Sequence, residues 1–115
     1  MKKLNWANIK GLIMSAEQEY EKIVEYLTST HNGVAGQMFG KKCIKINGKA
    51  GVALFKDFLV FKLSEDMHSK AISLTNSVLW DPSGKGRKMK EWVQVSIEHK
   101  QFFEEFAEAS AEYVG

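Results

Sequence analysis

The stretch that decides the fold runs from Gly36 to Leu63 and reads GQMFGKKCIKINGKAGVALFKDFLVFKL. Within it, Cys43–Ile46 alternates with a period of two, which is typical of a strand with one buried face. Asn47-Gly48 follows, and both residues tolerate the positive φ angles that a two-residue type I′ turn requires. Gly51–Phe55 is short, apolar and rich in β-forming residues, so these segments predict a β-hairpin.

A third strand follows the hairpin. Lys56-Asp57 predicts the next reversal of the chain, and Phe58–Leu63 is aromatic and almost continuously apolar. Strands that are buried on both faces have this composition, so we expect Phe58–Leu63 to lie inside the sheet and not at its edge. Before the meander, Val34–Phe39 is expected to be an extended segment that leads into the sheet.

Helical patterns flank the meander. Ser15 opens the first helix, because S-A-E-Q places Gln18 where the two side chains can form a capping box. Apolar residues then recur at helical spacing, and the helix is expected to end near Ser29. Ser64 is expected to cap a second helix, whose first turn carries two acidic residues that favour the helix dipole.

The C-terminal half predicts two further strands and a third helix. Val78–Trp80 is expected to be a short strand, followed by a loop over Asp81–Gly86 that holds two glycines and a proline. Glu91–Ile97 alternates strictly, with Trp92 on one face of the expected strand and three branched apolar residues on the other. A final helix is expected over Glu98–Val114.

The predicted order is therefore one helix, three strands, one helix, two strands and one helix. Helices packed on an antiparallel sheet of about five strands make an α+β fold. The 115 residues fit one domain, which buries roughly 65% of its unfolded surface. We assign residues 15–115 to this domain and residues 1–14 to an N-terminal extension.

Composition limits the classes of function. Sixteen Lys and Arg residues stand against fourteen Asp and Glu residues, and a net charge of +2 does not by itself indicate a nucleic-acid partner. Cys43 is the single cysteine, so an internal disulfide is excluded and a reducing cytoplasm is expected. No run approaches the roughly 18 apolar residues of a membrane span, so no membrane contact is expected.

Catalytic and metal-binding patterns are missing from the sequence. His31, His68 and His99 are isolated, there is no C-x-x-C pair, and no G-x-S-x-G nucleophile motif occurs. We therefore expect a protein that is not an enzyme and that needs neither a metal ion nor another cofactor.

Basic residues follow the glycine loop at four positions: Lys85, Arg87, Lys88 and Lys90. Glycines allow backbone N–H groups to turn toward an anion, and the four cations would strengthen the local field, so this segment is a candidate anion or nucleic-acid site. The alternative is a solvated loop whose charges keep a sheet edge soluble. Trp92 lies just beyond and is expected to pack inside the protein instead of stacking on a base.

Aromatic residues gather in the last predicted helix. Phe102, Phe103 and Phe106 exceed what a small core strictly needs, so they form a candidate interface with a partner protein or with a second copy of the chain. The alternative is that the same rings fill the space between helix and sheet.

Three stretches then share their order and spacing with a known family: Met38–Gly40, the run Asn47–Lys62, and Asp81–Val93. Together they resemble the N-terminal domain of the TfoX/Sxy family of competence-regulator-like proteins, over roughly Ser15–Tyr113. Lys41 stands where that family has a second glycine, and Lys88 replaces its usual proline.

The resemblance implies a small α+β domain with an antiparallel sheet, of the secretion-chaperone-like type, and it brings no catalytic site. We therefore expect a stand-alone bacterial domain with a regulatory role, which acts through contact with an unknown protein or with itself as a homodimer. A nucleic-acid or anion-binding module that uses residues 85–90 is the alternative. A third alternative, a small-molecule enzyme or binder, requires an apolar pocket with convergent polar groups.

Overall fold

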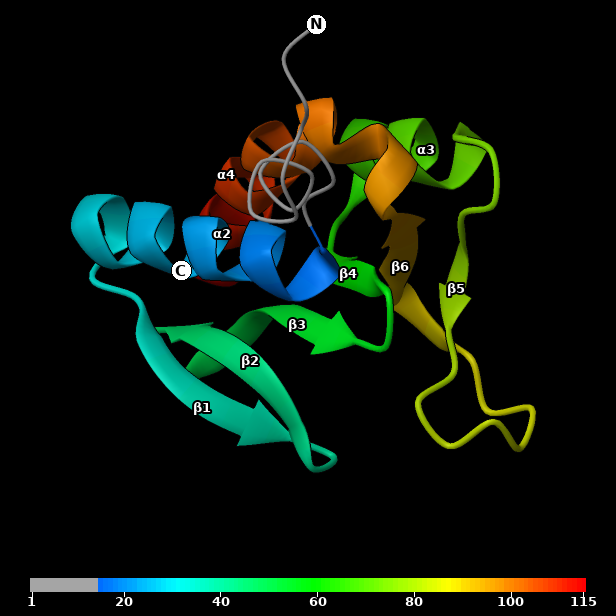
Figure 1. Cartoon of the computed structure of the whole chain (residues 1–115), viewed down its shortest axis with the longest axis horizontal. Coiled ribbons are helices and arrows are strands. Elements are labelled where there is room, and N and C mark those ends of the chain that lie inside the picture. The colour runs from blue at the N-terminus through cyan, green and yellow to red at the C-terminus, as the bar shows by residue number, and fades with distance from the viewer. Residues whose placement is uncertain (1–14) are drawn as a thin grey trace, which may run out of the picture.

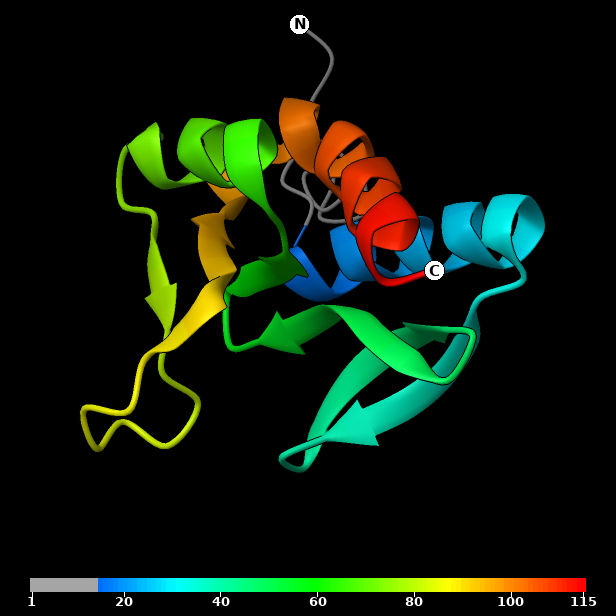
Figure 2. The ribbon, with the colours of Figure 1, turned by 180° about the vertical axis from the view of Figure 1, so that it is seen from behind.

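The computed structural model describes residues 15–115 (Figures 1 and 2), so the predicted extension lies outside the described residues. The elements in chain order are α2 (Ala16–His31), β1 (Val34–Met38), β2 (Lys41–Ile46), β3 (Lys49–Phe55), β4 (Phe58–Lys62), α3 (Glu65–Ser73), β5 (Val78–Trp80), β6 (Met89–Ser96), the 3₁₀-helix η1 (Ile97–Phe102) and α4 (Phe103–Val114).

The strands form one antiparallel sheet in the order β1-β2-β3-β4-β6-β5, which confirms the α+β class. The sheet has six strands because the segment expected to lead into it is itself strand β1. A two-residue turn at Phe39-Gly40 joins β1 to β2, with φ angles of 53° and 74°. A phenylalanine rarely adopts a positive φ, which is why the sequence pattern did not indicate this turn.

The turns of the predicted meander are confirmed. Asn47 and Gly48 have φ angles of 51° and 79°, and they join β2 to β3 as a type I′ turn requires. Lys56-Asp57 reverses the chain between β3 and β4. Strand β4 lies between β3 and β6, and its central residues Leu59, Val60 and Phe61 are fully buried, so the prediction of an internal strand is also confirmed.

The two predicted helix caps differ in outcome. The Gln18 backbone N–H donates to Ser15 Oγ at 3.1 Å, and the Ser15 N–H donates to Gln18 Oε1 at 2.9 Å, which confirms the capping box of α2. Ser64 is the N-cap residue of α3, as predicted, but its side chain does not act as a cap. Its hydroxyl makes no capping hydrogen bond, and Glu65 enters the helix with a left-handed φ of 51°.

The last predicted helix, Glu98–Val114, is divided into η1 and α4, so the prediction of one continuous helix is wrong. The Ser96 hydroxyl accepts a hydrogen bond from the Glu98 N–H and begins a tight 3₁₀ turn. His99 then has non-helical dihedrals of −104° and 24°, and its Nε2 is 2.8 Å from the Thr75 carbonyl oxygen. These contacts with neighbouring elements stop a single α-helix from running through the segment.

Helices α2, α3 and α4 cover one face of the sheet (Figures 1 and 2). The main hydrophobic core lies between the helices and the sheet. It buries side chains from β2, β3, β4 and β6. Fully burying one such side chain stabilises the fold by about 1.5–3 kcal/mol. The core includes Leu27, Ile44, Val52, Leu59, Phe61, Val93, Phe103 and Phe106.

The opposite face of the sheet is concave and buries a second cluster, formed by Cys43, Ala53, Val60, Trp80 and Trp92. The Trp80 ring lies 5.4 Å from the Trp92 ring between centroids, and 6.2 Å from the ring of Phe39. Phe39 belongs to the turn beside edge strand β1, whereas Trp80 belongs to β5 at the other edge. Contact between the two edges requires a strongly twisted and curled sheet.

Helix α4 packs very closely on β3 at Gly51. A Cβ atom placed on Gly51 would come within 2.9 Å of Ser110 Oγ and 3.3 Å of Val114 Cγ2. Both of those side chains are buried, and the Ser110 hydroxyl donates a hydrogen bond to the Gly51 carbonyl oxygen. The close approach of helix and strand therefore depends on the missing side chain.

We expect Gly51→Ala to lower the free energy of unfolding by about 1–3 kcal/mol, because the methyl group overpacks a buried contact. Gly36→Ala is the matched control, because its Cβ would meet only the flexible end of Lys45. That change should alter stability by no more than about 0.5 kcal/mol. Urea unfolding followed by circular dichroism measures both, and equal effects of the two substitutions would contradict the packing described.

Candidate binding trough and basic loop

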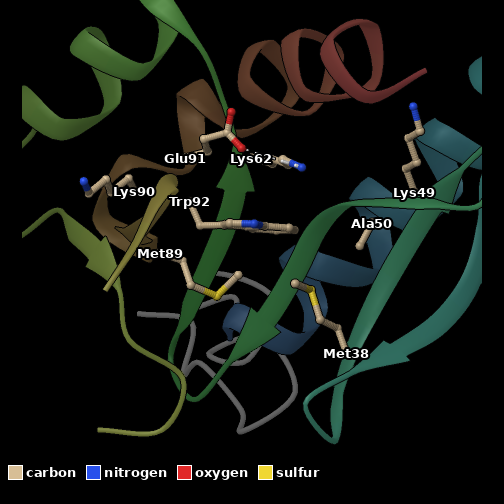
Figure 3. Close-up of a pocket in the computed structure, with 8 residues that line it drawn as sticks. All are labelled: Met38, Lys49, Ala50, Lys62, Met89, Lys90, Glu91 and Trp92. Atoms are coloured by element: carbon tan, nitrogen blue, oxygen red, sulfur yellow. Dashed lines mark ion pairs between the residues drawn. The ribbon is translucent and has the colours of Figure 1, made fainter. Parts of the chain in front are cut away.

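A hollow of about 560 Å³ lies on the concave side of the sheet (Figure 3). We call it the trough. Residues from four strands line it, and they come from well-separated parts of the chain: Met38, Lys49, Ala50, Lys62, Met89, Lys90, Glu91 and Trp92.

The floor of the trough is apolar. The Trp92 ring forms part of it and is only 4% exposed, because the remainder of the ring packs against the concave cluster. Met38 and Met89 flank this ring from opposite sides (Figure 3). Methionine side chains are unbranched and polarizable, so such a floor can adjust to apolar groups of different shape.

The rim of the trough is basic. Lys62 Nζ lies 3.8 Å from a carboxylate oxygen of Glu91, and the Tyr113 hydroxyl donates a hydrogen bond to the other oxygen of that carboxylate. Within residues 15–115, no acidic group lies at ion-pair distance from Lys49 or Lys90. Lys49 and Lys90 therefore stand at the rim without an acidic partner among these residues, although their ammonium groups point away from the Trp92 ring (Figure 3).

Charge is divided between the segments that form the sheet and the rest of the described chain. The sheet segments, residues 34–63 and 78–96, carry ten Lys and Arg residues against three Asp and Glu residues. The remaining residues from 15 to 115 carry three basic residues against eleven acidic ones. The sheet segments thus have a net charge of +7 that the overall charge of +2 conceals, and they attract anions.

The loop between β5 and β6 folds around its own anion. The Asp81 carboxylate accepts hydrogen bonds from the backbone N–H groups of Gly84 and Gly86, at 3.1 Å and 2.8 Å, and from the Ser83 hydroxyl. The Lys85 N–H donates to Ser83 Oγ at 3.2 Å. The Gly84 and Gly86 N–H groups therefore already have an acceptor within the loop, and an anion at the candidate site would have to compete with Asp81 for them.

The same contacts set the acidity of Asp81. Loss of hydration raises the pKa of this carboxyl, but hydrogen bonds from Gly86, Ser83, Gly84 and Lys85 outweigh that effect, so the pKa lies below its usual value. Because the pKa is lowered in the folded chain, the carboxylate holds the loop fully above pH of about 3.9. This stabilisation of the loop is lost as the pH falls through the lowered pKa and the carboxylate becomes protonated.

The four basic residues of the predicted anion site do not converge on one point. Lys85, Arg87, Lys88 and Lys90 are all exposed. Lys90 lines the trough, whereas Arg87 lines a second hollow of about 370 Å³ between the Phe39 turn and the loop. The side chains form part of a broad basic surface and not a single pocket.

The candidate aromatic interface needs correction at two of its three residues. Phe103 and Phe106 are 1% and 0% exposed, and their rings lie 5.5 Å and 5.6 Å from the ring of Phe61. They belong to the core, because the 3₁₀ turn before α4 directs this side of the helix onto the sheet. Phe102 is partly buried, with Lys70 Nζ 4.9 Å from its ring centroid.

Sequence reasoning missed the trough itself. Its lining residues are separated by up to 54 positions in the chain, from Met38 to Trp92, and no local motif joins them. The available signal was the alternation of strands β3, β4 and β6, which places Trp92 on the face opposite Val93. That signal predicts the face of the sheet on which each side chain lies. It does not predict the curvature of the sheet that brings these side chains close together.

Residues 15–115 contain no group of three or more His, Cys, Asp and Glu side chains placed to hold a metal ion. In the same range no helix has the length and apolar character needed to cross a membrane. Comparisons with protein-family models, with curated proteins and with solved structures find no match.

We expect Asp81→Ala to release the loop, because the substitution removes the acceptor for three hydrogen bonds. The Gly84 and Gly86 amides should then exchange hydrogen faster, as measured by nuclear magnetic resonance, and inorganic sulfate should bind near them. Asp57→Ala, which removes an exposed acidic residue from another turn, is the control. Unchanged amide exchange in Asp81→Ala would contradict the internal-anion arrangement.

Proposed function

We propose that this chain is a non-enzymatic binding domain, of the TfoX N-terminal type, that acts in a regulatory role through contact with another protein in the bacterial cytoplasm. The trough is its contact surface, and the partner supplies an acidic segment that also carries apolar side chains. The observation that carries the proposal is that Lys49 and Lys90, which pair with no acidic group of residues 15–115, stand at the rim of a hollow with an apolar floor.

The size and chemistry of the trough support this occupant. A hollow of about 560 Å³ is large enough for several side chains of an extended peptide. Apolar groups of the peptide would lie on Trp92, Met38 and Met89, while its carboxylates would meet the rim lysines. The surrounding positive charge of the sheet segments would attract an acidic peptide over a distance and so raise the rate of association.

The choice of surface also follows from the rest of the molecule. The aromatic rings of α4 lie mostly in the core, so the last helix offers little apolar surface to a partner. The helical side carries a net negative charge, which opposes an acidic partner. The resemblance to the TfoX family supports a domain that works by binding.

The trough makes a specific prediction for charge reversal. Lys90→Glu should weaken binding of a fluorescein-labelled peptide of alternating Glu and Leu residues by about tenfold, because an attraction becomes a repulsion. Lys100→Glu is the matched control, since it makes the same change at an exposed residue among the acidic helical segments. Fluorescence anisotropy at low and physiological salt measures both.

A second variant separates shape from charge. Ala50→Trp should fill the trough without changing the charge of its rim, and it should also abolish peptide binding. Equal loss of affinity in Lys90→Glu and Lys100→Glu, or full binding by a folded Ala50→Trp variant, would refute the trough as the contact surface.

Nucleic acid is the second candidate partner, and the charge of the sheet segments favours it. Lys85, Arg87 and Lys88 are exposed on a loop that Asp81 holds in shape. If this surface binds duplex DNA, the logarithm of affinity should fall with the logarithm of salt concentration, with a slope of about −0.9 per phosphate contact. The double change Arg87→Glu and Lys88→Glu should then abolish binding in a filter or anisotropy assay, and absence of binding at low salt would reject this candidate.

A further inference from the structure

In the sheet formed by residues 15–115, strand β1 lies at an edge, and its own sequence lacks the usual protection. Its sequence, VAGQM, has no charged residue and no proline, and its pairing with β2 runs without a register shift. Val34 is 64% exposed at its start. Natural edge strands normally carry lysines, prolines or bulges that prevent pairing with other chains, so a bare edge of this kind indicates a surface that pairs.

The hairpin turn decides which backbone groups of β1 are free. Phe39-Gly40 is a two-residue turn, so Met38 and Lys41 form a hydrogen-bonded pair beside it. In an antiparallel ladder such pairs alternate along the strand. The N–H and C=O groups of Val34, Gly36 and Met38 therefore point toward β2, and those of Ala35 and Gln37 point outward.

We propose that β1 pairs with β1 of a second copy of this chain, antiparallel and about a twofold axis at Gly36. Ala35 then lies opposite Gln37 of the partner subunit, and the two equivalent pairs form four backbone hydrogen bonds. Side chains alternate between the two faces of a strand, so Val34 points to the same face as Met38, which packs against the concave cluster. On that face Val34 therefore meets Met38 of the partner subunit. The exposed Val34 side chain thereby gains an apolar neighbour in the dimer.

The structure favours a closed dimer, formed by pairing of β1 with β1, over an open filament formed by pairing of β1 with β5. Strand β5 forms the opposite edge of the described sheet, but it has only three residues and its pairing contains a register shift. Pairing of β1 with β5 would also be heterologous and would continue into a filament. Pairing of β1 with itself is isologous and closes after two copies.

Lys45 provides a signature of this register. A Cβ on Gly36 would lie 3.1 Å from Lys45 Cε and 3.7 Å from its Nζ, so the lysine side chain lies across Gly36. A twofold axis at Gly36 brings the two Lys45 ammonium groups to within about 10 Å of each other. Their repulsion weakens the dimer, and added salt screens it. The dimer should therefore become tighter as salt rises, which is opposite to the behaviour of an anion complex.

Analytical ultracentrifugation of the full chain tests the interface. We expect the wild type to show a reversible monomer–dimer equilibrium. Ala35→Pro should raise the dissociation constant at least tenfold, because it removes an outward N–H donor but no bond to β2. Ala35→Thr keeps that N–H group and is the matched control, which should remain dimeric. Lys45→Gln should lower the dissociation constant about twofold at low salt and change it little at high salt.

Three results would overturn the proposal. A wild type that remains monomeric at about 1 mM would do so, as would a folded Ala35→Pro variant with the wild-type dissociation constant. Should Ala35→Pro fail to fold, Val34→Glu replaces it, because this change keeps every backbone donor and puts two carboxylates into the interface. Persistence of the dimer in a folded Val34→Glu variant would then reject this pairing. These outcomes do not depend on what the trough binds.

Discussion

The sheet has two apolar faces, but the helices of residues 15–115 cover only one of them. Strand β4 shows the conflict, because Leu59 and Phe61 point to the helices while Val60 points to the other side, and all three are buried. The chain resolves it by curling the sheet until its two edges meet through Phe39 and Trp80. Both the concave cluster and the trough are consequences of that curvature.

The glycine loop shows how a familiar composition can lead to an unexpected arrangement. Two glycines among four cations suggest a site for an external phosphate, yet the backbone donors turn toward Asp81. The acid stands at the start of the loop, close enough for its carboxylate to reach Gly86 five residues later. The cations are left on the outer surface, where they contribute to a broad field and not to a single coordinated anion.

Local signals predicted the parts of the fold that local chemistry decides. Asn47-Gly48 accepts positive φ angles at little cost, and the capping box of Ser15 needs only residues within one helical turn. The turn at Phe39-Gly40 could not be predicted in this way, because a contact with Trp80, 41 residues away, accompanies its uncommon backbone conformation. The trough could not be predicted either, since its lysines and methionines converge only after five strands have paired.

The separation of charge affects how the molecule is oriented as it approaches a charged surface. With basic groups concentrated in the sheet segments and acidic groups in the helical ones, the described part of the chain is an electric dipole despite its small net charge. An external field exerts a torque on such a body. Near a negatively charged surface it rotates so that its strands lead, and near a positively charged chromatography resin it rotates the other way. One protein can thus be retained by ion exchangers of both signs.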